Sequence, residues 1–163
     1  MTTPSSRLPE DFLTVRPDWL ALHDEAALAP AMPIIDPHHH LWGHAGHPYF
    51  LPELLADTNT GHRIEATVFV ECRAMYRADG PVEAKSLGET EFVNGVAAMS
   101  ASGQFGPTRA CAAIVGNVDL RWGARAHAAL EAHIAVAGGR FRGIRNGSAW
   151  DASGIRATSA NPP

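Results

Sequence analysis

Three consecutive histidines, His38, His39 and His40, follow the short apolar segment PIID. Side chains alternate across a strand, so His38 and His40 are expected on one side and His39 on the other. Two imidazoles on one side can share a divalent ion, each bonding it through a ring nitrogen at about 2.0–2.1 Å. Asp36, one alternation earlier, is expected on the same face, where it would orient an imidazole or line the site. We therefore predict that His38 and His40 are metal ligands.

Four further residues are candidates for binding a substrate: Glu71, Arg73, Tyr76 and Arg145. Glu71 closes an apolar run and Arg145 ends the segment FRGIR, while Arg73 and Tyr76 lie in an irregular stretch of about sixteen residues, longer than most connections. A guanidinium can hold a carboxylate through two parallel hydrogen bonds. The alternatives are a solvated strand-end charge for Glu71 and ordinary surface charge for the arginines. Two more histidines, His44 and His47, follow the motif in a Gly- and Pro-containing segment that we expect to be a loop. The alternatives are ordinary loop residues, which we favour, and a loop that folds over the site.

The elements that must position these residues alternate between two periodicities. Short β-branched and apolar runs predict strands over 31–36, 62–72, 108–120 and 140–150. Helical patterns lie over 16–30, 49–61, 89–103 and 122–139. This βα alternation predicts an α/β fold with a parallel sheet. We assign residues 1–31 to an amino-terminal extension with a helix and 32–163 to the main domain, which closes in a loop over 151–163.

Composition narrows the classes of function. The 163 residues suffice for one domain, and a net charge of -4 without basic runs argues against binding nucleic acid or an anionic membrane surface. No secretory leader and no run of 18 apolar residues is visible, so we predict a cytoplasmic protein with a small-molecule substrate. Cys72 and Cys111 lie far apart in apolar stretches and are expected to be reduced. A homo-oligomer is compatible with these features.

The segment IIDPHHHLW resembles the Asp-x-His-x-His-Leu-Trp signature that opens the amidohydrolase-related family (amidohydrolase 2). These distorted TIM-barrel, metal-dependent hydrolases include 2-pyrone-4,6-dicarboxylate lactonase and sugar-lactone hydrolases. The resemblance continues more weakly through ATVFVEC and FRGIRNG and covers about residues 32–147. It implies a (β/α)8 barrel, which typically needs about 250 residues, with only about the first four βα units in this chain. It also implies that His38 and His40 bind zinc or manganese, although some relatives need no metal.

The same resemblance implies hydrolysis of a lactone, another ester or a C–N bond by activated water, although the family also contains decarboxylases. Its members take further ligands from the fifth and sixth strands and a water-activating aspartate from the eighth. We expect this chain to be an amino-terminal half without that aspartate, and inactive alone. His127 and His133, six apart in a helix, do not share a face and are poor substitutes. Alternatives are a non-enzymatic truncated product, a subunit that completes its barrel with another chain, or, less favoured, a histidine-based metal-binding module.

Overall fold

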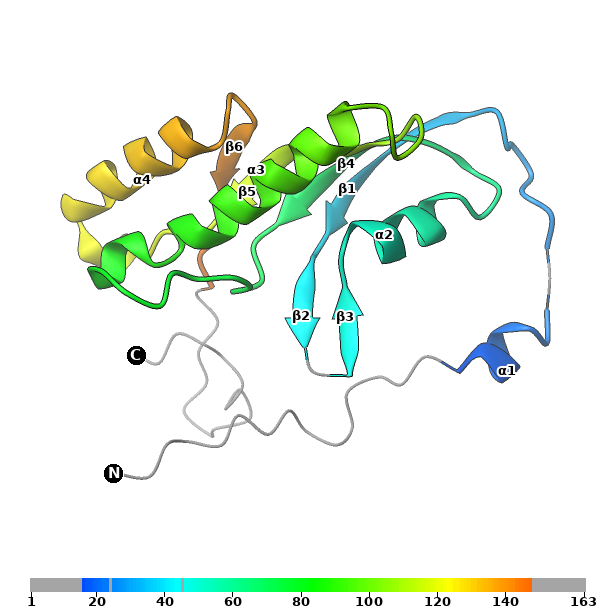
Figure 1. Ribbon diagram of the computed structural model, residues 1–163, viewed down its shortest axis with the longest axis horizontal. Coiled ribbons are helices and arrows are strands. Elements are labelled where there is room, and N and C mark those ends of the chain that lie inside the picture. The colour runs from blue at the N-terminus through cyan, green and yellow to red at the C-terminus, as the bar shows by residue number, and fades with distance from the viewer. Residues whose placement is uncertain (1–15, 24, 45, 148–163) are drawn as a thin grey trace.

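A parallel four-stranded sheet forms the centre of the computed structural model, which describes residues 16–23, 25–44 and 46–147 (Figure 1). Its strands lie in the order in which they follow one another along the chain, β1-β4-β5-β6. They are β1 (Pro33–His39), β4 (Arg63–Val70), β5 (Arg109–Gly116) and β6 (Phe141–Ile144). Each neighbouring pair is parallel. The prediction of an α/β fold with a parallel sheet is confirmed.

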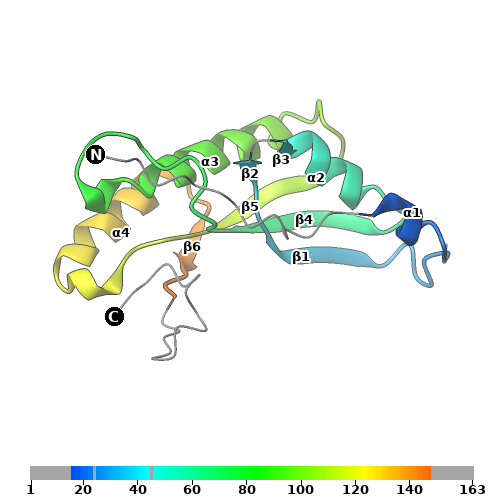
Figure 2. The same cartoon turned by 90° about the horizontal axis from the view of Figure 1, so that it is seen from below.

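The connecting helices lie on one face of the sheet, as Figure 2 shows. They are α2 (Leu51–Thr58), α3 (Leu87–Ala101) and α4 (Arg125–Val136), with two short 3₁₀ turns, η1 (Val82–Ala84) and η2 (Leu120–Trp122). A doubly wound sheet would carry helices on both faces and reverse its strand order, so this arrangement is singly wound. In the described part of the chain, no helix has the length and apolar character needed to cross a membrane.

The hydrophobic core lies between the sheet and these helices. Phe69 of β4 and Ile114 of β5 are 0 % exposed and pack with the fully buried Val93 of α3. Burial of each such side chain contributes about 1.5–3 kcal/mol. Alternate residues of the strands point away from the helices, and Ile35 of β1 is 64 % exposed there. One face of the sheet is thus packed and the other is open.

Two local expectations are wrong. The helix predicted over 16–30 is only one turn, α1 (Pro17–Leu20), and the apolar side chains around it, such as Trp19 and Leu28, are exposed. A short helix without a packed face is marginal in water, so its local propensity does not suffice. The loop expected after the histidines instead contains the antiparallel pair β2 (Trp42–His44) and β3 (His47–Tyr49). The loop predicted over 151–163 lies outside the described residues.

Candidate functional site

Polar residues gather where the four parallel strands end. His38 and His40 lie at the end of β1, Glu71 follows β4, and Arg145 follows β6. The Glu71 amide donates to the Val115 carbonyl of β5 at 2.8 Å, and the Arg145 amide donates to the Gly116 carbonyl at 2.9 Å. The backbone therefore places these strand ends side by side. The carboxyl end of parallel strands is the edge where α/β proteins form their binding sites.

The His38 and His40 rings face each other at this edge. Their Nε2 atoms are 3.2 Å apart, and the rings meet edge to face with centroids 4.9 Å apart. His40 Nδ1 lies 2.7 Å from the Val70 carbonyl oxygen, which can only accept, so Nδ1 carries the proton. Burial, followed by the positive charge of Arg145, lowers the pKa of His40. His40 is therefore held neutral, with the lone pair of Nε2 directed at His38.

The strand β1 is irregular next to these two rings. Asp36 pairs with Thr67 and His39 with Phe69, so two residues of β1 oppose one residue of β4 between these pairs. Such a bulge breaks strict alternation and redirects side chains. Asp36 was predicted to orient an imidazole or to line the site. Its Oδ1 accepts the His38 backbone N–H at 3.0 Å, and Asp36 lines the same groove as His38. Asp36 thus stabilises the irregular backbone between Asp36 and His39.

His39 belongs to the core rather than to the site. Its ring is 8 % exposed, with Nε2 2.8 Å from the Thr67 hydroxyl and 3.7 Å from the Cys111 sulfur. Burial lowers the pKa of His39, so its ring is neutral and bonded within the layer between sheet and helices. The middle histidine of the triplet therefore has a structural role, while its neighbours lie on the other side of the strand.

Glu71 and Arg145, both predicted to contact a substrate, contact each other. Arg145 Nε donates to Glu71 Oε1 at 2.7 Å, and Nη2 donates to the Glu71 backbone carbonyl. The Glu71 side chain is 10 % exposed, whereas that of Arg145 is 43 % exposed. Asn117, just after β5, donates from Nδ2 to the Arg145 carbonyl at 2.8 Å. The carboxylate thus orients the guanidinium, which is the more accessible of the pair.

Arg73 and Tyr76 lie in the loop after β4, which has an unusual backbone. Arg73 and Met75 have φ values of 66° and 53°, in the left-handed region that non-glycine residues seldom adopt. Arg73 is exposed, but the Tyr76 hydroxyl is buried. Burial, together with the charges of Glu89 and Glu71, raises the pKa of Tyr76, so this phenol is a neutral group beneath the loop. The structure therefore presents Arg73, and not the Tyr76 hydroxyl, to solvent.

A shallow pocket of about 230 Å³ separates this loop from the β2–β3 hairpin. Its lining comprises Trp42, Gly43, His44, Cys72, Arg73, Ala74 and Met75. The Trp42 ring stacks on His44 and packs against Tyr49, with centroid distances of 5.9 and 5.3 Å. His40 lies next in this row, 6.4 Å from Trp42. The pocket therefore has an aromatic wall on one side and Arg73 on the other, and His40 lies behind that wall, in contact with Trp42 but outside the lining.

Two buried titratable residues were given no structural role from the sequence alone. Glu89, in the first turn of α3, is 1 % exposed and accepts backbone N–H groups of the loop after β4. His133 of α4 is 0 % exposed, with Nε2 3.1 Å from Ser86 Oγ and Nδ1 2.8 Å from Thr90 Oγ1. The Ser86–His133 contact has the geometry of a nucleophile and base, but its place within the helix layer gives no access to a substrate. Periodicity alone would assign both to ordinary helix positions.

Across residues 16–23, 25–44 and 46–147, no group of three or more His, Cys, Asp or Glu side chains is placed to share one metal ion. The His38–His40 pair thus provides two ligands. A scan of protein-family models and searches of curated proteins and solved structures found no match to this chain.

Proposed function

We propose that this chain is the amino-terminal half of a (β/α)8 barrel of the amidohydrolase-related type, and that its strand ends form half of a hydrolytic site. The substrate class is a lactone or a related cyclic ester, attacked by activated water. The observation that carries the proposal is the 3.2 Å approach of the His38 and His40 Nε2 atoms at the carboxyl end of β1. The resemblance of IIDPHHHLW to the family signature supports the same assignment.

The architecture supports the barrel. In a (β/α)8 barrel, consecutive strands are neighbours, all helices lie outside, and the inner face of the sheet is enclosed by the remaining strands. The described strands follow that order, with helices on one face and the exposed Ile35 on the other. A groove of about 500 Å³ runs between β1 and α2; its lining includes the apolar Ile34, Leu54 and Ile64 and also Asp36 and His38. Strands completing the barrel would pair with the edges of β1 and β6.

The histidine pair fits a divalent metal as two of its ligands. Two nitrogens on one tetrahedral zinc, each at about 2.0–2.1 Å, lie about 3.3 Å apart, close to the spacing of the two Nε2 atoms. The bond from His40 Nδ1 to Val70 is the outer contact that typically orients a metal-binding imidazole. A zinc or manganese ion held there would polarise a carbonyl and lower the pKa of water. The other ligands and the base would come from the strands that complete the barrel.

Arg145 is the substrate-binding residue at this edge. Glu71 holds its guanidinium through Nε and Nη2, so its orientation is set before a ligand arrives. A fixed guanidinium can donate to the carbonyl oxygen or a carboxylate of the substrate with little loss of side-chain entropy. Glu71 then acts through Arg145 rather than on the substrate itself, and Arg73 faces the adjoining pocket.

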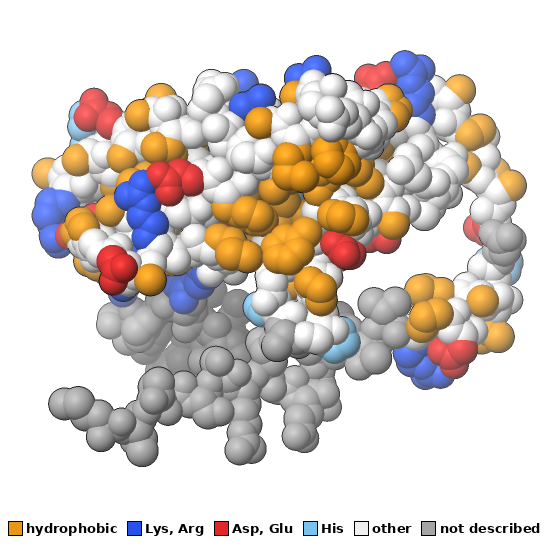
Figure 3. Space-filling view, viewed as in Figure 1, with side chains coloured by type: hydrophobic (Ala, Val, Ile, Leu, Met, Phe, Trp, Pro, Cys, Tyr) orange, Lys and Arg blue, Asp and Glu red, His pale blue; other side chains and the backbone are white. Residues whose placement is uncertain are grey.

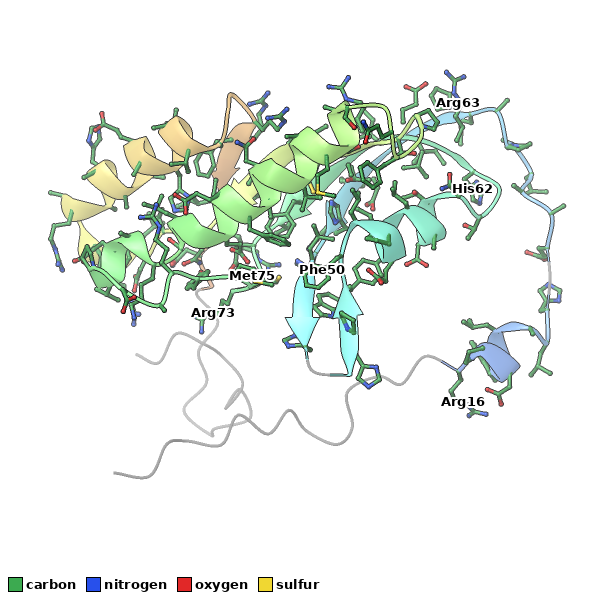
Figure 4. All side chains as sticks on the ribbon, in the orientation of Figure 1. Arg16, Phe50, His62, Arg63, Arg73 and Met75 are labelled. Carbon is green, nitrogen blue, oxygen red and sulfur yellow. The ribbon has the colours of Figure 1, made fainter. Side chains whose placement is uncertain are left out.

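Zinc titration of the whole chain tests the proposal. We expect His38→Ala and His40→Ala each to weaken zinc binding at least tenfold, or about 1.4 kcal/mol, measured by isothermal titration calorimetry. His62→Ala is the matched control, because His62 is exposed and lies at the opposite end of β4 (Figure 4). It should bind zinc as the wild type does. Equal binding by wild type and both ligand variants would contradict the site.

A further inference from the structure

The buried carboxylate of Glu89, in the first turn of α3, holds the loop after β4 in place. Glu89 Oε1 accepts the backbone N–H of Cys72 at 2.9 Å and that of Ala74 at 2.8 Å. These two amides flank Arg73, whose φ is 66°. A left-handed backbone at a non-glycine residue costs about 1–3 kcal/mol and persists only where its surroundings impose it. Here the two hydrogen bonds to Glu89 impose it, from a different element of the fold.

Close packing against the first turn of α3 reinforces this clamp. A Cβ atom on Gly88 would lie 2.4 Å from the Met75 carbonyl oxygen and 2.8 Å from the Arg77 nitrogen, so only glycine allows this approach. The Arg77 amide donates to the Lys85 carbonyl at 2.9 Å, and its guanidinium pairs with Glu91. The loop backbone from Cys72 to Arg77 is therefore seated on the amino-terminal turn of α3.

Burial of the Glu89 carboxylate destabilises the folded state, because the side chain loses its contact with water. Within the described chain, its Oε2 and the Tyr76 hydroxyl are the buried side-chain polar atoms without a hydrogen-bond partner. An unpaired buried carboxylate oxygen destabilises the folded state, and burial accordingly raises the pKa of Glu89 to about 7. The bonds that offset this cost go to the loop, so the carboxylate stabilises the loop conformation rather than α3.

The loop in turn forms one wall of the pocket beside the histidine pair. A Cβ atom added to Gly43 of β2 would lie 3.2 Å from the Met75 methyl and 3.1 Å from the Phe50 ring, so the loop packs closely on this strand. Figure 4 shows Met75 beside Phe50 and Arg73 projecting from the same loop. Phe50 packs edge to face on Phe92 of α3, with centroids 5.9 Å apart. Figure 3 shows a hydrophobic surface where α2, β3 and α3 meet. Moving the loop would therefore change the pocket between Trp42 and Arg73.

We propose that Glu89 is a positioning residue, which fixes the left-handed turn at Arg73 and so determines the shape of the pocket beside His38 and His40. The inference deepens the proposed function and rests on it, because it assigns this pocket to the substrate. Specificity for the substrate would then depend on a residue of α3 that does not reach the pocket itself. Glu89 acts through the Cys72 and Ala74 amides and touches neither metal nor substrate.

Backbone amide exchange and the Met75 methyl resonance test this role by NMR. In Glu89→Ala, we expect the Cys72 and Ala74 amides to exchange at least about tenfold faster, and the Met75 methyl shift to move toward that of free methionine. Glu89→Gln should restore both, because its Oε1 accepts the same two bonds. Gly88→Ala should displace the Met75 methyl through its clash, while Gly95→Ala, with open space around it on the same helix, should not. The Glu71 amide, bonded to Val115, is the internal control for the sheet.

A pH titration separates positioning from general packing. Between pH 5.5 and 8.5 the Cys72 and Ala74 amide shifts should titrate in the wild type with Glu89, whose pKa is about 7, and not in Glu89→Gln. Glu71, Tyr76 and Cys72 also face this carboxylate. Burial raises the pKa of the Tyr76 phenol, and it raises the pKa of the Cys72 thiol to about 11, so neither of these two groups titrates in this pH range. Unaltered exchange in Glu89→Ala, or failure of Glu89→Gln to restore it, would overturn the inference. These readouts need no zinc, so a failed zinc titration would refute the proposed function alone.

Discussion

Two histidines of this protein, His40 and His133, share a lowered pKa caused mainly by burial, yet their surroundings assign them different chemistry. His133 lies between α3 and α4, where both ring nitrogens are bonded to hydroxyls and the ring stacks on Phe141 at 5.3 Å. His40 lies at a strand end, where only Nδ1 is bonded to the backbone and Nε2 faces His38. A ring whose two nitrogens are both bonded within the helix layer stabilises the fold, whereas a ring whose Nε2 faces a second imidazole at a strand end can bind a metal together with it.

His40 and His133 differ in their surroundings because they lie in different parts of the fold, His133 between the helices and His40 at the end of a strand. Helix-facing positions of a parallel sheet are closed by packing, so any polar group there must find its partners within the protein. The carboxyl ends of the strands are closed by loops, which leave space for ligands. His39 follows the same rule, although it is the immediate neighbour of His38 and His40. Its ring lies on the helix side of the sheet and bonds Thr67 within the protein.

The largest expected effect is on stability, from His133→Ala. Removing this ring loses the stack on Phe141 and leaves the Ser86 and Thr90 hydroxyls buried without partners. We expect the free energy of unfolding to fall by about 3–5 kcal/mol. His38→Ala, at an exposed position, should change it by less than about 0.5 kcal/mol. Urea denaturation followed by circular dichroism measures both variants.

Similar losses of unfolding free energy in His133→Ala and His38→Ala would contradict the distinction between the two histidine environments. A loss of several kcal/mol in His38→Ala would mean that the histidine pair is itself a structural element. His127→Ala is a matched control on α4, because His127 is exposed and pairs with Glu131 only at 3.8 Å. Its effect should be as small as that of His38→Ala.

The regular elements of the fold were accessible from the sequence, because their periodicity reports burial directly. The β-branched run Ile64–Val70 lies within β4, and the alanine-rich segment contains α4. The helix predicted over 16–30 failed because its apolar residues, including Leu28, have nothing to pack against. The hairpin β2–β3 was missed because its strands have only three residues each, too few to show alternation.

The site residues that lie at strand ends could be predicted from the sequence. His38 and His40 follow the strand predicted over 31–36, whereas Glu71 and Arg145 lie within the strands predicted over 62–72 and 140–150. The observed strands β4 and β6 end just before Glu71 and Arg145, and the structure brings all four residues to one edge. The clamp by Glu89 was not accessible, because an acidic residue in the first turn of a helix is expected there for electrostatic reasons alone. Glu89 bonds the amides of Cys72 and Ala74, which are seventeen and fifteen positions away in the sequence, and no local sequence pattern predicts the turn that brings them together.

A smaller effect is expected on the pH dependence of stability. Burial lowers the pKa of His133 from 6.5 in the folded state, so the unfolded chain binds the additional proton as the pH falls below about 6.5. Stability that is present at pH 7.5 should therefore be lost toward pH 5.5, with a slope of at most about 1.4 kcal/mol per pH unit for this site. His39 and His40 act in the same direction, whereas Glu89, with a raised pKa, acts in the opposite one.

His133→Gln isolates this contribution. Subtracting its free energy of unfolding from that of the wild type, at each pH from 7.5 to 5.5, removes the groups that the two proteins share. The difference should decrease as the pH is lowered. A difference that stays constant would show that His133 is protonated to the same extent in both states, and the contrast between the two histidines would then rest on hydrogen bonding alone.

The smallest effect is expected at the Glu71–Arg145 pair, which is half exposed on the arginine side. A double-mutant cycle with Glu71→Gln and Arg145→Gln should give a coupling free energy of about 0.2–1 kcal/mol in urea denaturation, because solvent screens a pair at this depth. A coupling free energy of this size means that Glu71 orients Arg145 while the pair contributes little to the stability of the fold, as expected if Arg145 binds a ligand. A coupling above about 2 kcal/mol would place the pair with His133, among the interactions that hold the layers together, and the strand-end edge would lose its distinction from the helix layer.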